Sequence, residues 1–193
     1  MKKYLFIIVC VLIVSCSSEF DELNDFSETR FELVDQNNQR IIFPNDFKDK
    51  TVVMNFIFTN CPDICPLSTN NLRLVQESLT KEKVKGVQFL SISFDPDFDK
   101  PEVLKKFAEI RKLNLGNWAF LTGEKSIIDS LMRKAEIVAI PSDSRIFDDG
   151  RKIYFYVHTD RIVIMDRDGK IRKQYPGSSI DPEIVAKDVI SIN

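Results

Sequence analysis

The sequence predicts an α/β domain in which helices cover a central, buried sheet. Two apolar runs, at residues 51–58 and 87–94, are nearly continuous and rich in β-branched and aromatic side chains. Such runs are typical of strands buried on both faces. Each run precedes a segment with helical character, and pairs of short apolar runs near both ends of the chain indicate hairpins. With 15 phenylalanines and a hydrophobic fraction of 44%, the chain can form a single domain with a sizeable core.

The N-terminal half is predicted to alternate strands and helices. Its strands lie at residues 31–34, 41–43, 51–58 and 87–94. The first two lie on either side of a turn-like segment, which predicts an N-terminal β-hairpin. A helix begins at Pro66, between the two buried strands, and its apolar side consists of Leu67, Leu72, Val75 and Leu79. Pro101, at a first-turn position, opens a second helix that ends near Arg111.

The C-terminal half is predicted to end in a second hairpin and a helix. Its strands lie at residues 118–121, 154–157, 161–165 and 171–175. One helix covers residues 126–134, with Thr122 or Ser126 as its cap, and the last begins at Asp181. Residues 141–152 are polar and turn-rich. In this order the elements describe a thioredoxin-like α/β sandwich, in which chemistry lies at the carboxyl ends of the central strands.

The first 16 residues resemble a bacterial lipoprotein signal. Residues 4–14 are apolar but too few to span a bilayer comfortably, and they end in Ile-Val-Ser-Cys, which resembles a lipobox. The expected divisions are a signal peptide at residues 1–15, a lipidated, flexible tether at 16–29 and a globular domain at 30–193. Acylation of Cys16 would hold the domain on a membrane of the cell envelope, facing the periplasm or the exterior. An uncleaved signal anchor is the alternative.

Charge excludes one class of partner. Without residues 1–15 the formal net charge of −2 becomes −4, because Lys2 and Lys3 leave. A basic patch is the electrostatic mark of a nucleic-acid interface, and this chain has none. We therefore expect no nucleic-acid partner.

Two cysteines form the candidate site. Cys10 lies in the signal and Cys16 at its end, which leaves Cys61 and Cys65 just after a buried strand. Residues four apart on a helix have Cα atoms about 6 Å apart, within the roughly 4.4–6.8 Å that a disulfide accepts. Free N–H groups of the first helical turn would favour a thiolate on Cys61. The pair could be a metal site, a reversible redox pair or a structural bridge, although a bridge over so short a loop would stabilise little.

His158 is the only histidine in the chain and lies between two predicted strands. Two sulfurs and one imidazole nitrogen suit copper better than calcium or magnesium. Cys61, Cys65 and His158 are therefore the candidate metal ligands. An ordinary buried or surface histidine is the alternative.

Acidic residues near these positions are weaker candidates. Asp63 could be a ligand or a proton acceptor, but a carboxylate at a helix N-terminus is more often only a favourable charge. The segment Asp95-Pro96-Asp97 predicts a turn and a helix cap. Asp160 is expected to be solvated.

The motif around the cysteines resembles the signature of the Sco/SenC family of copper chaperones, which help to assemble cytochrome c oxidase. It reads Phe-Thr-Asn-Cys-Pro-Asp-Ile-Cys-Pro at residues 58–66. The likeness continues, in the same order, in Ser-Ile-Ser-Phe-Asp-Pro at 91–96, in Trp118 with Leu-Thr-Gly at 121–123, and in Val-His-Thr at 157–159 with Asp-Arg-Asp-Gly at 166–169. It spans about residues 30–190.

The resemblance implies a thioredoxin-like fold with an N-terminal β-hairpin and an insertion, here residues 141–157, before the histidine strand. It implies one copper, Cu(I) or Cu(II), per domain, bound by the two cysteines and the histidine. Two positions depart from the family pattern. Many members have Asp where this chain has Val157, and Phe94 replaces the usual Ile. The first departure weakens any role of an Asp beside the histidine, and neither changes a ligand.

Taken with what the resemblance implies, the sequence leaves two functions open. In the first, the protein delivers copper to the dinuclear copper centre of cytochrome c oxidase subunit II, or to another copper-site recipient, by ligand exchange. In the second, it is a thiol–disulfide oxidoreductase that reduces the cysteines of that centre, with Cys61 attacking and Cys65 resolving. A peroxidase would need a polar group over the sulfur, for which Thr59 alone is thin support.

Overall fold

The computed structural model describes residues 20–61, 64–146 and 152–193. The helices in this part of the chain are α1 (Ile64–Lys81), α2 (Pro101–Ile110), α3 (Lys125–Lys134) and α4 (Pro182–Ile192). The strands are β1 (Asn24–Asp25), β2 (Phe31–Asp35), β3 (Arg40–Phe43), β4 (Thr51–Ile57), β5 (Val87–Ser93), β6 (Trp118–Thr122), β7 (Ala139–Ile146), β8 (Lys152–His158), β9 (Ile162–Met165) and β10 (Lys170–Tyr175). Eight of them form one sheet in the order β1-β10-β9-β4-β5-β6-β2-β3, and β7 and β8 form a separate pair.

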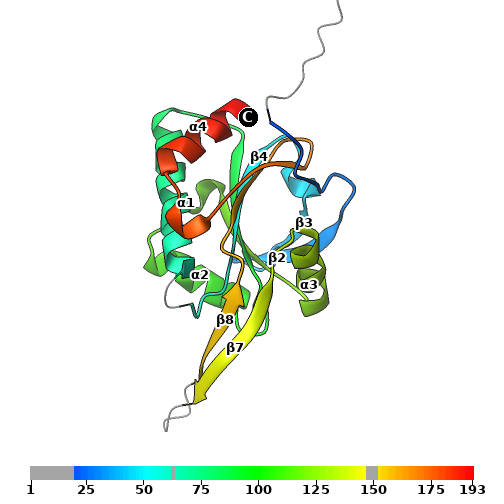
Figure 1. The fold of residues 1–193 in the computed structure, drawn as a ribbon, viewed down its shortest axis with the longest axis vertical. Coiled ribbons are helices and arrows are strands. Elements are labelled where there is room, and N and C mark those ends of the chain that lie inside the picture. Colours follow the sequence, from blue (N-terminus) through cyan, green and yellow to red (C-terminus); the bar gives the residue numbers. More distant parts are fainter. Residues whose placement is uncertain (1–19, 62–63, 147–151) are drawn as a thin grey trace, which may run out of the picture.

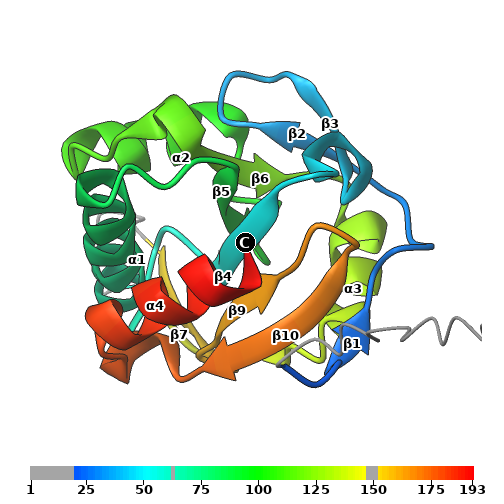
Figure 2. The ribbon, with the colours of Figure 1, turned by 90° about the horizontal axis from the view of Figure 1, so that it is seen from above.

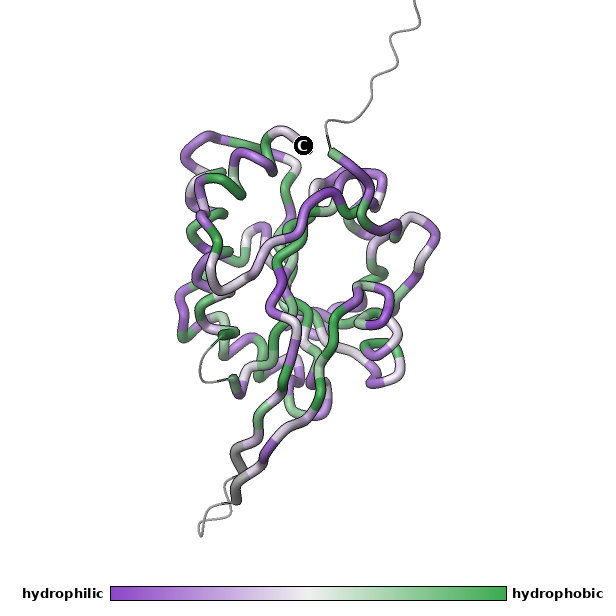
Figure 3. The backbone as a smooth tube through the Cα atoms, viewed as in Figure 1, coloured by the Kyte–Doolittle hydropathy of each residue, from purple (hydrophilic) through white to green (hydrophobic). Residues whose placement is uncertain are grey.

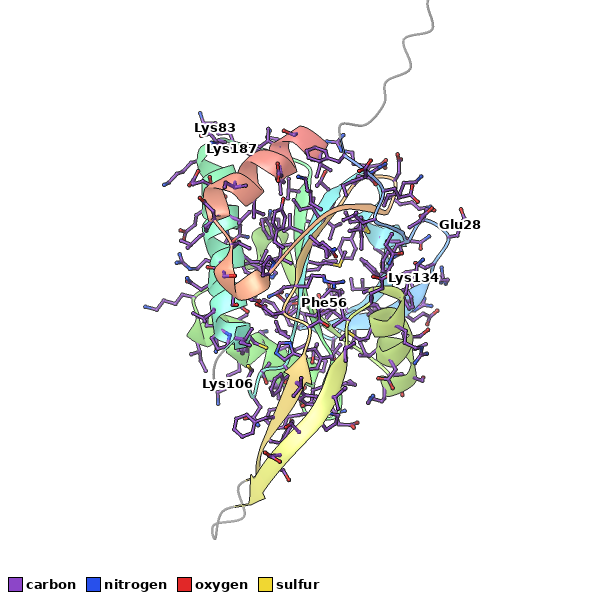
Figure 4. All side chains as sticks on the ribbon, viewed as in Figure 1. Glu28, Phe56, Lys83, Lys106, Lys134 and Lys187 are labelled. Atoms are coloured by element: carbon purple, nitrogen blue, oxygen red, sulfur yellow. The ribbon has the colours of Figure 1, made fainter. Side chains whose placement is uncertain are left out.

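The centre of the large sheet consists of the strands that the sequence predicts to be buried. β4 runs parallel to β5, and β5 to β6, and every residue of β4 and β5 is buried. Helices α1, α2 and α4 lie on one side of these strands and α3 on the other (Figures 1 and 2). Phe56 of β4 therefore lies in the interior, whereas Lys83 and Lys187 lie on the outside (Figure 4). The predicted thioredoxin-like α/β fold, with β2 and β3 as its N-terminal hairpin, is confirmed.

Helix α1 has one buried side, as its sequence predicts. The tube in Figure 3 alternates between hydrophilic and hydrophobic residues along it. Leu72, Val75 and Leu79 are buried. The helix begins two residues before the predicted start at Pro66, and Leu67 is wrongly assigned to the buried side, because it is 50% exposed.

Residues 20–29 belong to the folded domain, which corrects the expectation of a flexible tether through residue 29. β1 pairs antiparallel with β10. Phe26 is only 1% exposed, and its ring lies 5.7 Å from that of Phe43. The N–H groups of Leu23 and Phe26 also donate to the carbonyls of Ile171 and Gly169, both at 2.8 Å, so backbone hydrogen bonds and a buried ring together hold the segment on the sheet. The expected signal peptide and Cys16 lie outside the described residues.

Strands β7 and β8, at residues 139–146 and 152–158, form an arm that projects from the body (Figure 1). β7 and β8 pair antiparallel, with Ala139 opposite His158, and the register shifts between Pro141 and Ser144. The prediction of a turn-rich segment at 141–152 is therefore wrong for the described residues. Residues 142–144 are polar and exposed, and β7 is a strand because it pairs with β8 on both sides of this shift, not because its apolar residues alternate.

The helix ends match their predicted residues only in part. Asp181 caps α4, because its side chain accepts from the backbone N–H groups of Glu183, at 3.0 Å, and Ile184, at 3.4 Å. Neither Thr122 nor Ser126 caps α3, whose N-cap is Glu124 without a side-chain hydrogen bond. Among the described residues, no helix has the length and apolar character needed to cross a bilayer.

Candidate metal centre

The two cysteines lie where the central strand β4 passes into helix α1. Beyond the end of the strand, the N–H of Cys61 donates to the carbonyl of Phe58 at 3.3 Å. Cys65 lies in the first turn of α1, and its N–H donates to Cys61 Sγ at 3.4 Å. Cys61 is partly exposed and Cys65 is 1% exposed, and both are thiols rather than halves of a disulfide. The structure thus places one accessible and one buried sulfur side by side.

His158 completes the cluster from the other side. It is the last residue of β8, and its Nε2 lies 3.8 Å from Cys65 Sγ. One ligand atom from each of Cys61, Cys65 and His158 lies within 4.8 Å of the others. The arm therefore brings together the three residues that the sequence singles out.

The imidazole is oriented by its surroundings. Its Nδ1 lies 3.2 Å from the carbonyl of Thr159, so a proton on Nδ1 donates there and Nε2 keeps its lone pair facing the sulfurs. The ring packs against Phe94, at 5.1 Å between centroids, and edge-on against Phe58, at 6.1 Å. This arrangement favours Nε2 as the ligand atom, a choice that the sequence leaves open.

The sulfurs and the imidazole perturb each other's protonation. The hydrogen bond with Cys61, together with burial, raises the pKa of the Cys65 thiol. Burial by itself lowers the pKa of His158, but hydrogen bonds with Cys61 and with the Thr159 carbonyl, and the charges of Cys61 and Asp160, outweigh it and raise that pKa. A metal that binds here must therefore displace protons from the cluster.

The donor set fits a soft or borderline metal. Two sulfurs and one imidazole nitrogen match copper, whereas the hard cations calcium and magnesium prefer oxygen. Three protein ligands, two of them partly exposed, would leave a further coordination position accessible to an incoming group. Asp63 lies outside the described residues, and its candidate role remains a prediction.

A buried carboxylate that sequence reasoning missed, that of Asp99, holds the segment just before the cysteines. Asp99 is fully buried and accepts from the Thr59 N–H at 3.0 Å, from the Thr59 hydroxyl and from the Ser93 hydroxyl at 2.6 Å. Burial raises its pKa to about 6. Because the Thr59 hydroxyl donates to Asp99, it does not support a peroxidase. The only signal for Asp99 in the sequence is its position as a polar residue in the segment that follows the buried strand β5.

A second missed carboxylate, that of Asp95, holds the strand that ends at the histidine. The side chain of Asp95 accepts from the hydroxyl of Tyr154 and, at 3.4 Å, from that of Tyr156. Burial, and then the charge of Asp95, raises the pKa of Tyr156 to about 12. Burial, and then the hydrogen bond to Asp95, raises the pKa of Tyr154. The predicted turn at Asp95 is present, since its carbonyl accepts from the Asp99 N–H at 2.8 Å. The predicted helix cap is not, because the N-cap of α2 is Lys100.

Two other residues near the histidine also differ from expectation or from the family pattern. Asp160 is not simply solvated, because its carboxylate accepts from the Ser178 N–H at 2.8 Å. Val157, which departs from the family pattern expected from the sequence, is 65% exposed and faces away from the cluster, since alternate residues of a strand point to opposite sides.

The chain matches known proteins along nearly the whole described domain. Residues 21–192 match the SCO1/SenC family. A SCO1 protein homolog of Bacillus subtilis is 34% identical over 135 residues, which cover 70% of this chain and 66% of that protein. The crystal structure of a SCO1/SenC family lipoprotein from Bacillus anthracis superposes with a TM-score of 0.72 at 31% identity, covering 89% of this chain and 97% of the other. The structure of Bradyrhizobium japonicum ScoI with copper bound gives a TM-score of 0.71 at 27% identity, covering 85% and 98%. This chain therefore belongs to the SCO1/SenC family.

Proposed function

We propose that this protein binds one copper ion through Cys61, Cys65 and His158 and delivers it to cytochrome c oxidase subunit II or to another copper-site recipient. The observation that carries the proposal is the convergence of two sulfurs and one imidazole nitrogen within 4.8 Å. The copper-bound ScoI of Bradyrhizobium japonicum supports copper as the metal. The solved structure of BsSco, which is 30% identical and is described as a member of the Sco family of cytochrome c oxidase assembly proteins, supports the recipient.

The geometry suits transfer rather than storage. Cys65 is buried and Cys61 and His158 are only partly covered, so a recipient's thiolate can approach from the exposed side. Handover then proceeds by ligand exchange, in which an incoming thiolate replaces one ligand at a time. Thiolates alone can hold Cu(I), so we assign His158 chiefly to the stabilisation of Cu(II).

The proposed location is the outer side of a membrane of the cell envelope. The lipobox-like sequence before Cys16 supports acylation there, and the related protein from Bacillus anthracis is described as a lipoprotein. Mass spectrometry of the membrane-extracted chain tests this, because a mature N-terminus at an acylated Cys16 is expected. An unmodified Cys16 in that fraction would contradict it.

Thiol–disulfide exchange is the second candidate, and the adjacent thiols are the observation in its favour. The Cys61 thiolate would attack a substrate disulfide and release one substrate thiolate. Cys65, after losing its proton, would then attack Cys61 Sγ and release the second, so that the substrate gains two electrons and the protein becomes the disulfide. The raised pKa of Cys65 agrees with this order, but the chemistry has no need of an imidazole beside the sulfurs.

Copper titration of the fully reduced full-length chain, without oxygen for Cu(I) and separately with Cu(II), tests the proposed function. One copper per chain is expected, with thiolate–Cu(II) charge-transfer absorption that changes in His158→Ala. A protein that binds no stoichiometric copper, or that only becomes oxidised by it to a disulfide, would instead be the reductase.

A further inference from the structure

His158 is carried by an element that the main sheet does not hold. Among the described residues, β8 pairs with β7 alone. The outer side of the arm is open, with Phe155 42% and Val157 65% exposed. Isolated two-stranded hairpins are marginally stable at best in water. The position of the imidazole therefore depends on what holds the inner side of the arm against the body.

The inner side of the arm consists of Tyr154, Tyr156 and His158, which alternate with the exposed residues along β8. The rings of both tyrosines pack on Phe58, with centroids 6.3 Å and 5.0 Å away. These contacts are apolar and allow sliding. The directional contacts are the two tyrosine hydroxyls, which both donate to Asp95.

Asp95 is a fixed point for the arm because its own backbone is held. Its N–H donates to the Ser93 hydroxyl at 3.0 Å, and its carbonyl accepts from the N–H groups of Phe98 and Asp99. Its side chain is buried, and a buried carboxylate without hydrogen bonds is costly. Any displacement of the arm that separates the tyrosines from Asp95 therefore carries a penalty that an apolar contact would not impose.

The loop at residues 94–100, between β5 and α2, connects both halves of the metal site. Asp99 holds Thr59, two residues before Cys61, and Asp95 holds Tyr154 and Tyr156, which precede His158. One short segment thus makes hydrogen bonds both to the residues before the cysteines and to the strand that carries the histidine.

We propose that Asp95 is a positioning residue for His158: by holding the two tyrosines it places the imidazole within reach of copper on the cysteines. This inference rests on the proposed copper function and adds to it the residue that fixes the third ligand. Loss of Asp95 would then weaken the histidine–copper bond and leave the two sulfurs unaffected.

The test compares Asp95→Ala with Asp97→Ala in the full-length reduced chain. Asp97 is an exposed carboxylate of the same loop, which makes it the matched control. We expect Asp95→Ala to lower Cu(II) affinity about tenfold, as for other residues that orient a metal ligand, and to reduce the nitrogen hyperfine coupling in the Cu(II) EPR spectrum. Cu(I) affinity and the Asp97→Ala spectrum should be unchanged.

The same substitution in a His158→Ala background separates positioning from general loss of structure. If Asp95 acts through the imidazole, Asp95→Ala adds no further loss of Cu(II) affinity there. Equal losses in both backgrounds, or a normal spectrum for Asp95→Ala, would overturn the inference.

Tyr154→Phe provides a second route if Asp95→Ala does not fold, because it removes one hydroxyl and keeps the ring. We expect the same direction of change, with a smaller effect for Tyr156→Phe, whose hydroxyl is 3.4 Å from Asp95. If the wild type binds copper through the cysteines and the histidine, and Tyr154→Phe binds it in the same way, the positioning role of Asp95 is rejected and the proposed function is not. Absence of copper binding in the wild type would reject the proposed function and this inference with it.

Discussion

The cysteines and the histidine of the proposed copper site are held in different ways. The cysteines follow β4, a strand buried along its whole length and paired on both sides within the large sheet. His158 is the last residue of β8, one strand of the arm. The arm is a separate two-stranded sheet with an exposed outer side. Two of the three candidate ligands therefore lie in or against the buried core, whereas the third depends on the contacts that hold the arm against the body.

The largest expected effect is on the cysteine side. Cys65→Ser should lower Cu(I) affinity by more than about 100-fold, because a hydroxyl is a poor ligand for this soft ion. Competition with a Cu(I) chelator measures it. Leu67→Ala, on the exposed side of the same helix, is the control and should bind as the wild type does. Retained affinity in Cys65→Ser would show that the buried sulfur is not a ligand.

Asp99 should make the stability of the folded protein depend on pH. Its pKa in the folded protein is raised to about 6 from 3.8, so between about pH 4 and pH 6 the folded state holds a proton that the unfolded state has lost. The free energy of unfolding should therefore fall as pH rises through that interval, on the order of 2–3 kcal/mol from this group. Urea unfolding across the interval should show this fall in the wild type and a flatter profile in Asp99→Asn. Parallel profiles would refute the assignment.

A matched pair of valines compares core and arm directly. Val53 in β4 is fully buried, whereas Val157 in β8 is 65% exposed. Val53→Ala should lower the free energy of unfolding by about 1.5–3 kcal/mol. Val157→Ala should change it by no more than about 0.5 kcal/mol. Denaturant midpoints measure both, and similar losses in the two variants would mean that the outer side of the arm is covered in solution.

The same contrast explains how much could be predicted from sequence. The continuous apolar runs of β4 and β5 identify buried strands, and the position of Cys61 and Cys65 follows from the strand before them. In the arm, the strand predicted at 154–157 lies within β8. Its partner β7 could not be predicted, because it contains proline, serine and aspartate and is a strand only through its pairing with β8.

The two carboxylates of the connecting loop were hidden for another reason. Asp95 and Asp99 are buried, whereas aspartate is usually exposed. Their partners near the site, Thr59, Tyr154 and Tyr156, lie 40 to 61 residues away in the chain. The ligand set was predicted from residue chemistry and from the resemblance to a known family. The groups that place those ligands depend on tertiary contacts that no local pattern records.

The most direct test of the central claim is the coordination of Cu(II) bound to the wild-type chain. X-ray absorption at the copper edge, with pulsed EPR on the same sample, reports the number of sulfur and imidazole ligands. We predict one copper with two sulfurs and one imidazole nitrogen, from Cys61, Cys65 and His158. A site with no imidazole, or with only oxygen ligands beside oxidised cysteines, would contradict the account.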